Sequence, residues 1–398
     1  MEEADETLGR EAPTPRLFAG SFLRVFVASF VAHLAIFVHL HLPELLHTLG
    51  ANETAIGTTS AAFSLAAILS RPIVGTLLDR RGRRLVLLAG GAMHVVASGL
   101  YATVHAMGPW VLAVRAFHGI AAGFLFSAVF TVASDVVPDE RRTEAVAVFG
   151  ISGILPMSLG ALLGDRLLAI GDYRLVCLVS AGLALVSFAL SLGIPESRPA
   201  EASGGASRFR DALLAPSLPL LWLVGILFAT GLASYFVFVK SFALAAHLGD
   251  VSTFFTPYAL TAIAVRLFGS SMPERVGLER TLPPAIAILA VGLFALSTAH
   301  GATGLRIAGA FCGAGHGFAF PVLMALFVKR SGPAIRGSVI SLYTAIVDVA
   351  AVVAGPFLGA LADATDHRVL FRTAGACAVA SVLLFVGFDR RPPSHDVG

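Results

Sequence analysis

The chain alternates between long apolar runs and short polar breaks. Twelve runs approach or exceed about 20 residues, the length that an α-helix needs to cross the hydrocarbon core of a bilayer. They cover residues 17–42, 53–78, 84–106, 110–135, 143–168, 173–194, 216–247, 251–272, 281–299, 303–328, 337–362 and 368–388. This pattern predicts an all-α integral membrane protein with twelve transmembrane helices.

One of the polar breaks is much longer than the others. It covers residues 195–215, contains the run Ser203-Gly-Gly-Ala-Ser207, and separates the first six apolar runs from the last six. Serine and glycine in such a run favour a flexible linker. We therefore predict two six-helix bundles, 17–194 and 216–388, joined by a cytoplasmic linker at 195–215 and flanked by tails at 1–16 and 389–398.

The composition agrees with a membrane protein and excludes a soluble one. Hydrophobic residues make up 56% of the chain and charged residues 13%, whereas soluble domains carry about 25% charged residues. The net charge is +3, and the charged residues lie between the apolar runs and not in one basic stretch. We therefore expect a lipid bilayer as partner and no nucleic acid. No spacing of His, Cys or carboxylate residues suggests a metal site or an enzyme.

Arginine and lysine residues also predict the orientation. With both termini in the cytoplasm, most of the basic residues outside the spans fall on the cytoplasmic side, as the positive-inside rule requires. We therefore expect a multi-pass protein of a bacterial inner membrane with both termini cytoplasmic.

A charged turn lies between the second and third spans and recurs in the second half. Arg71, Asp79, Arg80 and Gly82 reappear 195 positions later as Arg266, Glu274, Arg275 and Gly277. The run Gly160-Ala-Leu-Leu-Gly-Asp165 at the end of span five likewise resembles Gly359-Ala-Leu-Ala-Asp363 at the end of span eleven. Repeats in the same order indicate a duplicated helical membrane protein, and most such proteins of this size are transporters.

These residues carry a resemblance to a known family. The turn contains Gly75, Asp79, Arg80, Gly82, Arg83 and Arg84 in the pattern Gly-x-x-x-Asp-Arg-x-Gly-Arg-Arg, which resembles the signature of the major facilitator superfamily. Arg115 with Gly119 and Gly123, and the turn that begins at Asp135, are also similar to that family. Arg71 and Arg266 resemble residues of bacterial arabinose-efflux-like and drug-efflux-like members. Span five departs from the drug exporters, because it lacks their Gly-Pro-x-x-Gly-Gly element.

The resemblance implies a gate at the charged turn. It implies that Asp79, Arg83 and Asp135 form a charge cluster that holds the two halves together when the central cavity faces outward. Gly82 would permit the reversal of the chain, and Gly75 would let a neighbouring helix approach closely. The alternative is that the arginines only set the topology.

Asp348 is an acidic residue near the middle of a predicted span. A charge at that depth is costly, so we expect it to face a cavity, to be paired or to be protonated. One interpretation is that Asp348 exchanges a proton or contacts the substrate. The other is a structural ion pair with Arg266 or another arginine.

Five further residues are candidates for the central cavity or for proton transfer. Arg115 is followed by small residues, and Arg71 and Arg266 occupy equivalent positions in the two halves. His118 and His316 lie in the fourth and tenth spans, and an imidazole can relay protons near neutral pH. For each of these side chains, helix packing or interface anchoring is the alternative interpretation.

The sequence thus predicts a secondary transporter that moves a small organic solute by alternating access, in the outward direction and in exchange for protons. No Gly-x-x-x-x-Gly-Lys-Ser/Thr loop for phosphate binding is present, so we expect no cofactor and a proton gradient as the energy source. We expect a monomer. The alternatives are proton-coupled uptake of a metabolite and a non-transporting membrane sensor or assembly factor.

Overall fold

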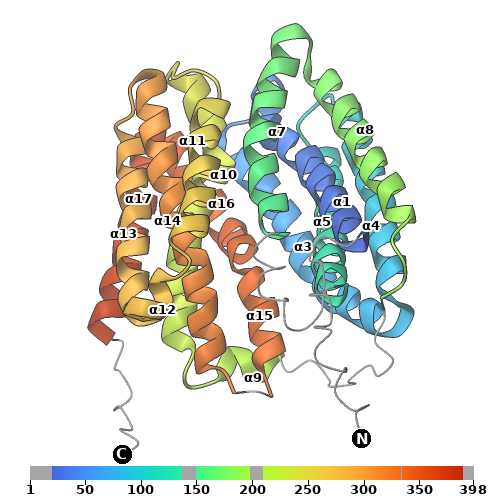
Figure 1. Ribbon diagram of the computed structural model, residues 1–398. Helices are drawn as coiled ribbons and strands as arrows, with labels where there is room; N and C mark the ends of the chain where they lie inside the picture. Colours follow the sequence, from blue (N-terminus) through green and yellow to red (C-terminus); the bar gives the residue numbers. More distant parts are fainter. Residues whose placement is uncertain (1–19, 137–148, 198–208, 333, 389–398) are drawn as a thin grey trace, which may run out of the picture.

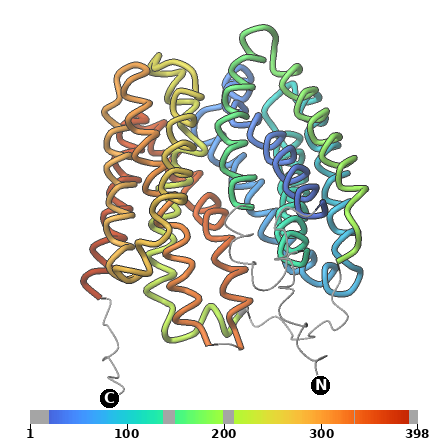
Figure 2. Tube along the Cα trace, in the orientation of Figure 1, coloured from blue at the N-terminus to red at the C-terminus, as the bar shows by residue number. Residues whose placement is uncertain are grey.

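The computed structural model of the protein describes residues 20–136, 149–197, 209–332 and 334–388. In this part of the chain the regular elements are helices, arranged in two bundles that lie side by side (Figures 1 and 2). The first bundle contains α1 Gly20–Val38, η1 His39–His41, α2 Leu42–Thr48, α3 Glu53–Arg81, α4 Arg83–Leu100, η2 Tyr101–Thr103, α5 Pro109–Asp135, α7 Ile151–Ile170 and α8 Tyr173–Leu192. The second contains α9 Phe209–Leu214, α10 Pro219–Ala245, α11 Ser252–Phe268, α12 Met272–Val276, α13 Leu278–Ser297, α14 Gly301–Arg330, α15 Arg336–Thr344, α16 Ile346–Ala364 and α17 His367–Phe388.

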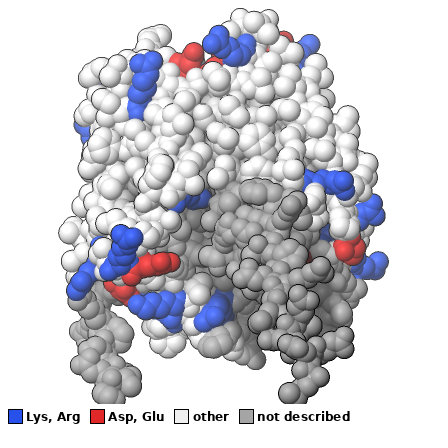
Figure 3. Space-filling model, in the orientation of Figure 1, with Lys and Arg blue, Asp and Glu red and all other residues white. Residues whose placement is uncertain are grey.

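Eleven of the described helical segments are long and apolar enough to cross a membrane. A further helix, α11, has 17 residues and coincides with the predicted span 251–272. Figure 3 shows that charged side chains gather toward the two ends of the molecule and leave a broad, largely uncharged belt on the visible face. The prediction of an all-α membrane protein is therefore confirmed.

The two ends of the molecule are named here by what they contain. The terminal end is the one at which α1 begins and α17 ends (Figure 1). The far end contains the connections at residues 49–52, 104–108, 171–172, 246–251, 298–300 and 365–366.

Local chemistry explains where several helices begin. The Asn52 side chain accepts a hydrogen bond from the Ala55 N–H at the start of α3, and Asp172 does the same for the first turn of α8. Pro109 and Pro219 occupy the first turns of α5 and α10, where the missing N–H has no intrahelical partner to lose.

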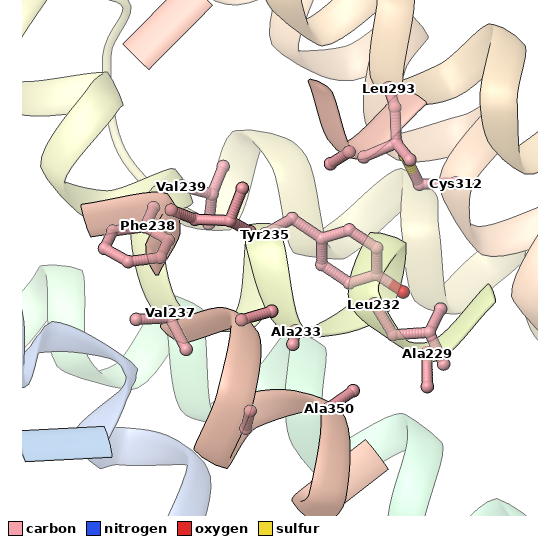
Figure 4. Close-up of a cluster of buried hydrophobic side chains, with 14 of the residues drawn as sticks. Ala229, Leu232, Ala233, Tyr235, Val237, Phe238, Val239, Leu293, Cys312 and Ala350 are labelled. Atoms are coloured by element: carbon pink, nitrogen blue, oxygen red, sulfur yellow. The ribbon is translucent and has the colours of Figure 1, made fainter. Parts of the chain in front are cut away.

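The helices of each bundle pack on one another, and the largest buried cluster of apolar side chains continues from one bundle into the other. In the first bundle α3 and α4 pack on α5, while α1 packs on α7 and α8; in the second, α13 packs on α14 and α17, and α10 on α16 and α17. Figure 4 shows buried side chains of α10 around Tyr235, with Leu293 and Cys312 on one side and Ala350 on the other. The halves meet mainly along two helix pairs, α3 with α16 and α7 with α11, and α10 makes smaller contacts with α2, α3 and η1.

One predicted span is not a continuous helix. The run 337–362 is divided at Ala345 into α15, which ends at Thr344, and α16, which begins at Ile346. The segment predicted as a linker contains the short helix α9. The break at Ala345 determines the geometry of the candidate site.

Candidate functional site

The helix break places Asp348 in the first turn of α16. The N-terminal end of a helix carries a partial positive charge, so a carboxylate is stabilised there. Thr344 is the last residue of α15, and the N–H of Ala345 beyond it bonds to the Leu342 and Tyr343 carbonyls, so the regular ladder of helix hydrogen bonds is interrupted there. Irregular backbone at membrane depth is tolerated where protein groups or a cavity satisfy it.

Arg71 of α3 contacts both Asp348 and Thr344 from the opposite half. Its guanidinium donates to Asp348 Oδ2 at 2.9 Å, to Thr344 Oγ1 at 3.0 Å and to the Thr344 carbonyl at 3.4 Å. Ser64 donates to the second carboxylate oxygen of Asp348 at 3.2 Å. The side chains of Arg71 and Asp348 are 15% and 23% exposed, so the pair is largely but not fully removed from solvent.

The structure thus decides between the possible partners of Asp348. The ion pair forms with Arg71, whereas Arg266 lies elsewhere: its Nε donates to the Gly317 carbonyl at 3.3 Å. Arg71 reaches across the interface because it lies on one face of α3 with Gly57 and Ser64, at intervals of seven residues. Gly57 touches α16 directly, since a Cβ added there would lie 2.2 Å from the Gly355 carbonyl oxygen.

At the far end, each half caps a helix of the other half. The Asp363 carboxylate of α16 accepts hydrogen bonds from the backbone N–H groups of Glu53 and Thr54, both at 2.8 Å, at the start of α3. The Asp165 carboxylate of α7 accepts from the backbone N–H of Ser252, at 2.8 Å, at the start of α11. Asp165 and Asp363 are the residues that end the repeated runs of spans five and eleven. We call these two contacts the reciprocal caps.

Other polar contacts at the far end reinforce the closure between the halves. Lys240 of α10 lies 2.7 Å from Glu44 Oε2 of α2. Glu53 Oε1 lies 3.1 Å both from His47 Nε2 in its own half and from His367 Nε2 in the other. The described polar contacts between the halves run from this end to the Arg71–Asp348 pair, so the molecule is closed at its far end.

The charged turn at the terminal end forms its cluster within one half. Arg83 Nε donates to Asp135 Oδ2 at 3.1 Å, and Arg83 NH1 lies 3.8 Å from Asp79 Oδ1. Gly82 has φ 100°, and its counterpart Gly277 has φ 95°, a backbone conformation that favours glycine. The equivalence of the two turns is therefore visible in the backbone, while the gating role of the cluster stays a prediction.

Two further details of this turn concern Gly75 and Glu196. A Cβ added at Gly75 would meet nothing within 4 Å, so in this far-end-closed arrangement no described helix approaches it closely, and its role in the outward-facing state stays a prediction. The close approach occurs instead at Gly57, and also at Gly119, where a Cβ would lie 2.0 Å from the Phe63 carbonyl oxygen. Glu196 has no motif to identify it, yet its carboxylate accepts the backbone N–H of Arg83 at 2.7 Å and caps α4. Arg80 and Arg84 are exposed at the two sides of the turn.

The two candidate histidines lie in separate clusters, one in each half. His118 is buried and bonded through Nδ1 to the Tyr101 hydroxyl at 3.0 Å, and Arg115 donates to the same hydroxyl at 3.1 Å. His316 is bonded to the Tyr258 hydroxyl in the second half. Arg115 and His118 are thus held inside the first bundle and do not meet Asp348.

No group of three His, Cys, Asp or Glu side chains in the described ranges is arranged to hold a metal ion. The sequence did not single out Thr344 or the far-end carboxylates as site residues. The signal for Asp165 and Asp363 was present in their repeated positions, but their partners are far away in the sequence.

The chain matches known proteins along most of its length. The model of the Major Facilitator Superfamily matches residues 18–346 and 221–398. The multidrug resistance protein MdtL of Klebsiella pneumoniae is 27% identical over 368 residues, covering 89% of this chain and 92% of that protein. The staphylopine export protein of Staphylococcus aureus is 20% identical over 395 residues, covering 94% and 97%. A solved structure of the nucleoside transporter NupG has a TM-score of 0.71 at 14% identity, covering 94% of this chain and all of that chain.

Proposed function

The chain belongs to the major facilitator superfamily, and on this premise we propose that it exports a small organic solute across a bacterial inner membrane in exchange for protons. The far end is then periplasmic and the terminal end cytoplasmic, as the distribution of basic residues predicts. The outward direction is supported by the names of two relatives, a multidrug resistance protein and a staphylopine export protein. The protein works as a monomer and needs no cofactor.

The observation that carries the proposal is the Arg71–Asp348 pair. It joins the two halves at the helix break, well inside the membrane span. The halves must move relative to each other during alternating access, so this contact differs between the two states of the transporter. An interaction present in one state only can bias the equilibrium between them.

Proton exchange at Asp348 provides a physical link to this movement. When Asp348 is ionised, it holds Arg71 and the Thr344 end of α15 in the far-end-closed arrangement. When Asp348 takes up a proton, the ionic attraction is lost and the pair weakens. In this proposal Asp348 is the proton carrier, and it releases its proton toward the cytoplasm in the far-end-closed arrangement.

The test is proton movement in everted membrane vesicles. Vesicles acidified by respiration carry a pH-sensitive acridine dye, and the dye signal recovers when an added solute is exchanged for internal protons. A panel of antibiotics, dyes, metallophores and organic acids is added to wild type, to Asp348→Asn and to Asp366→Asn. Asp366 is a matched control, because it caps α17 within its own half at 2.8 Å.

We expect the wild type and Asp366→Asn to respond to the same solutes, and Asp348→Asn to respond to none. An undiminished response of Asp348→Asn would refute its role as the proton carrier. Solute accumulation by whole cells, without any response in everted vesicles, would contradict export and favour uptake.

A further inference from the structure

Arg266 is the structural counterpart of Arg71. Gly57, Ser64 and Arg71 form the interface stripe of α3, and the residues 195 positions later form a stripe on α11: Ser252, Ala259 and Arg266. Ser252 bonds to Asp165 of α7, and Ala259 clusters with Ile154 of α7. Because residues seven apart share a helix face, Arg266 lies on the face of α11 that is directed toward the other half, about two turns nearer the terminal end than Ala259.

The two arginines differ in their partners. Arg71 is paired with a carboxylate, whereas among the described residues no carboxylate lies within ion-pair distance of Arg266. The repeat explains the difference. Asp348 stands eleven residues before Gly359, and the residue eleven before the equivalent Gly160 is Phe149, which is buried and apolar.

The neighbours of Arg266 leave most of its donors free. A guanidinium has five N–H donors, and in the described ranges only Nε has a hydrogen-bond partner, the Gly317 carbonyl. The titratable side chains that face it are Tyr258, Tyr343 and His316. Tyr343 donates to the Phe320 carbonyl at 2.6 Å, and Tyr258 and His316 bond to each other, so these polar atoms already have partners.

A guanidinium without a counter-ion inside a membrane protein is costly, and such residues mark ligand pathways. The Arg71–Asp348 pair is neutral as a unit, so Arg266 supplies the net positive charge of the interface at this depth. We propose that Arg266 binds the carboxylate of an organic anion, whose apolar body lies against the partly exposed ring of Phe320. The ring of Phe320 is itself supported by the buried ring of Tyr343, with 4.9 Å between the two centroids. The inference rests on the proposed transport function and assigns its substrate class.

Arginine suits this role better than lysine. Its planar fork offers two parallel N–H donors to the two oxygens of a carboxylate, which gives orientation as well as attraction. Binding of the anion also gives Arg266 a counter-ion. The first half provides none, because Phe149 stands at the position equivalent to Asp348. A cationic solute would meet the uncompensated charge of Arg266 and be excluded.

The experiment uses the purified full chain and two probes of equal shape, 2-naphthoate and its neutral amide. Binding is measured by isothermal titration calorimetry for wild type, Arg266→Gln, Arg266→Lys and Arg306→Gln. Arg306 is the matched control: it carries the same charge on α14 but lies near the far end, beside Ser252 and Thr253 in a separate surface cavity.

We expect the wild type to prefer the carboxylate over the amide by at least about tenfold, and Arg266→Gln to bind naphthoate about 10- to 100-fold more weakly. Arg266→Lys should retain part of the preference, while Arg306→Gln should keep all of it. Equal binding of acid and amide by the wild type would overturn the proposal without any variant. So would wild-type naphthoate binding by a folded Arg266→Gln protein.

The two proposals fail in different ways. Loss of naphthoate binding in Arg266→Gln with a normal proton response of Asp348→Asn would support the substrate class and refute the proton carrier. The reverse result would retain Asp348 and reject the anion site.

Discussion

The reciprocal caps make the far end the place where a small change should shift the conformational equilibrium most directly. The perturbation is Asp363→Ala, which removes one carboxylate and nothing else from α16. In the structure this carboxylate accepts two backbone N–H groups at the start of α3 and the Thr54 hydroxyl at 2.6 Å. These three bonds join the halves, so they exist only while the far end is closed.

The magnitude follows from the value of a helix cap. Replacing a capping carboxylate by alanine costs about 0.5–2 kcal/mol. The bond to Glu53 is partly buried, while the two bonds to Thr54 are exposed, so a loss of about 1–2 kcal/mol is reasonable, or about 5- to 30-fold in the ratio of open to closed far ends. Asp165→Ala should act in the same direction through α11. The two caps share no partner, so their effects should add.

The chain offers a control with the same chemistry. Asp366 caps α17 through the Val369 N–H at 2.8 Å, but donor and acceptor belong to the same half. Asp366→Ala should therefore cost helix stability without changing the equilibrium between the two arrangements of the halves.

Distances between spin labels measure that equilibrium. Labels at Arg174 and His300 are exposed at the far end of the first and second half, on a background in which Cys177, Cys312 and Cys377 are replaced by alanine. Pulsed electron resonance should show a larger long-distance population for Asp363→Ala than for wild type, and a still larger one with Asp165→Ala added. If Asp363→Ala and Asp366→Ala gave the same distance distribution, the caps would not hold the far end closed.

Three further predictions test the interface and the charged turn. The changes Arg71→Gln and Asp348→Asn should each lower the free energy of unfolding by about 1–3 kcal/mol, because each leaves a buried charge or donor without its partner. The double variant should lose less than the sum of the two, and a double-mutant cycle measured by thermal unfolding would detect the difference. Gly57→Ala should open the far end, since its Cβ would lie 2.2 Å from a backbone carbonyl of α16; unchanged label distances would contradict the close contact. Arg83→Gln should lower the melting temperature more than Arg80→Gln, because Arg83 is buried and bonded to Asp135 and to the Leu78 carbonyl, whereas Arg80 is exposed. Equal melting curves for the two variants would argue against a stabilising cluster.

The sequence by itself determined the class of the protein and much of its outline. Helix length in a membrane is set by bilayer thickness, which is a local requirement, so the apolar runs identified the spans, including α11. The turn at Gly82 and its counterpart at Gly277 were also local, because a positive φ is a property of the residue and its neighbours. The depth of Asp348 could be read in the same way from its place in an apolar run.

Tertiary structure alone decided which groups meet. The sequence left Arg266 or another arginine as the possible partner of Asp348, and the packing of α3 on α16 brings Arg71, 277 positions away, to this carboxylate. The break at Ala345 had no glycine or proline to announce it, and the contacts made there, from Arg71 to the Thr344 carbonyl and to Asp348, come from the other half. The reciprocal caps depend in the same way on how the bundles face each other. Which distant residues become partners depends on how the helices assemble, because the local sequence around each residue is the same whether or not its partner is near.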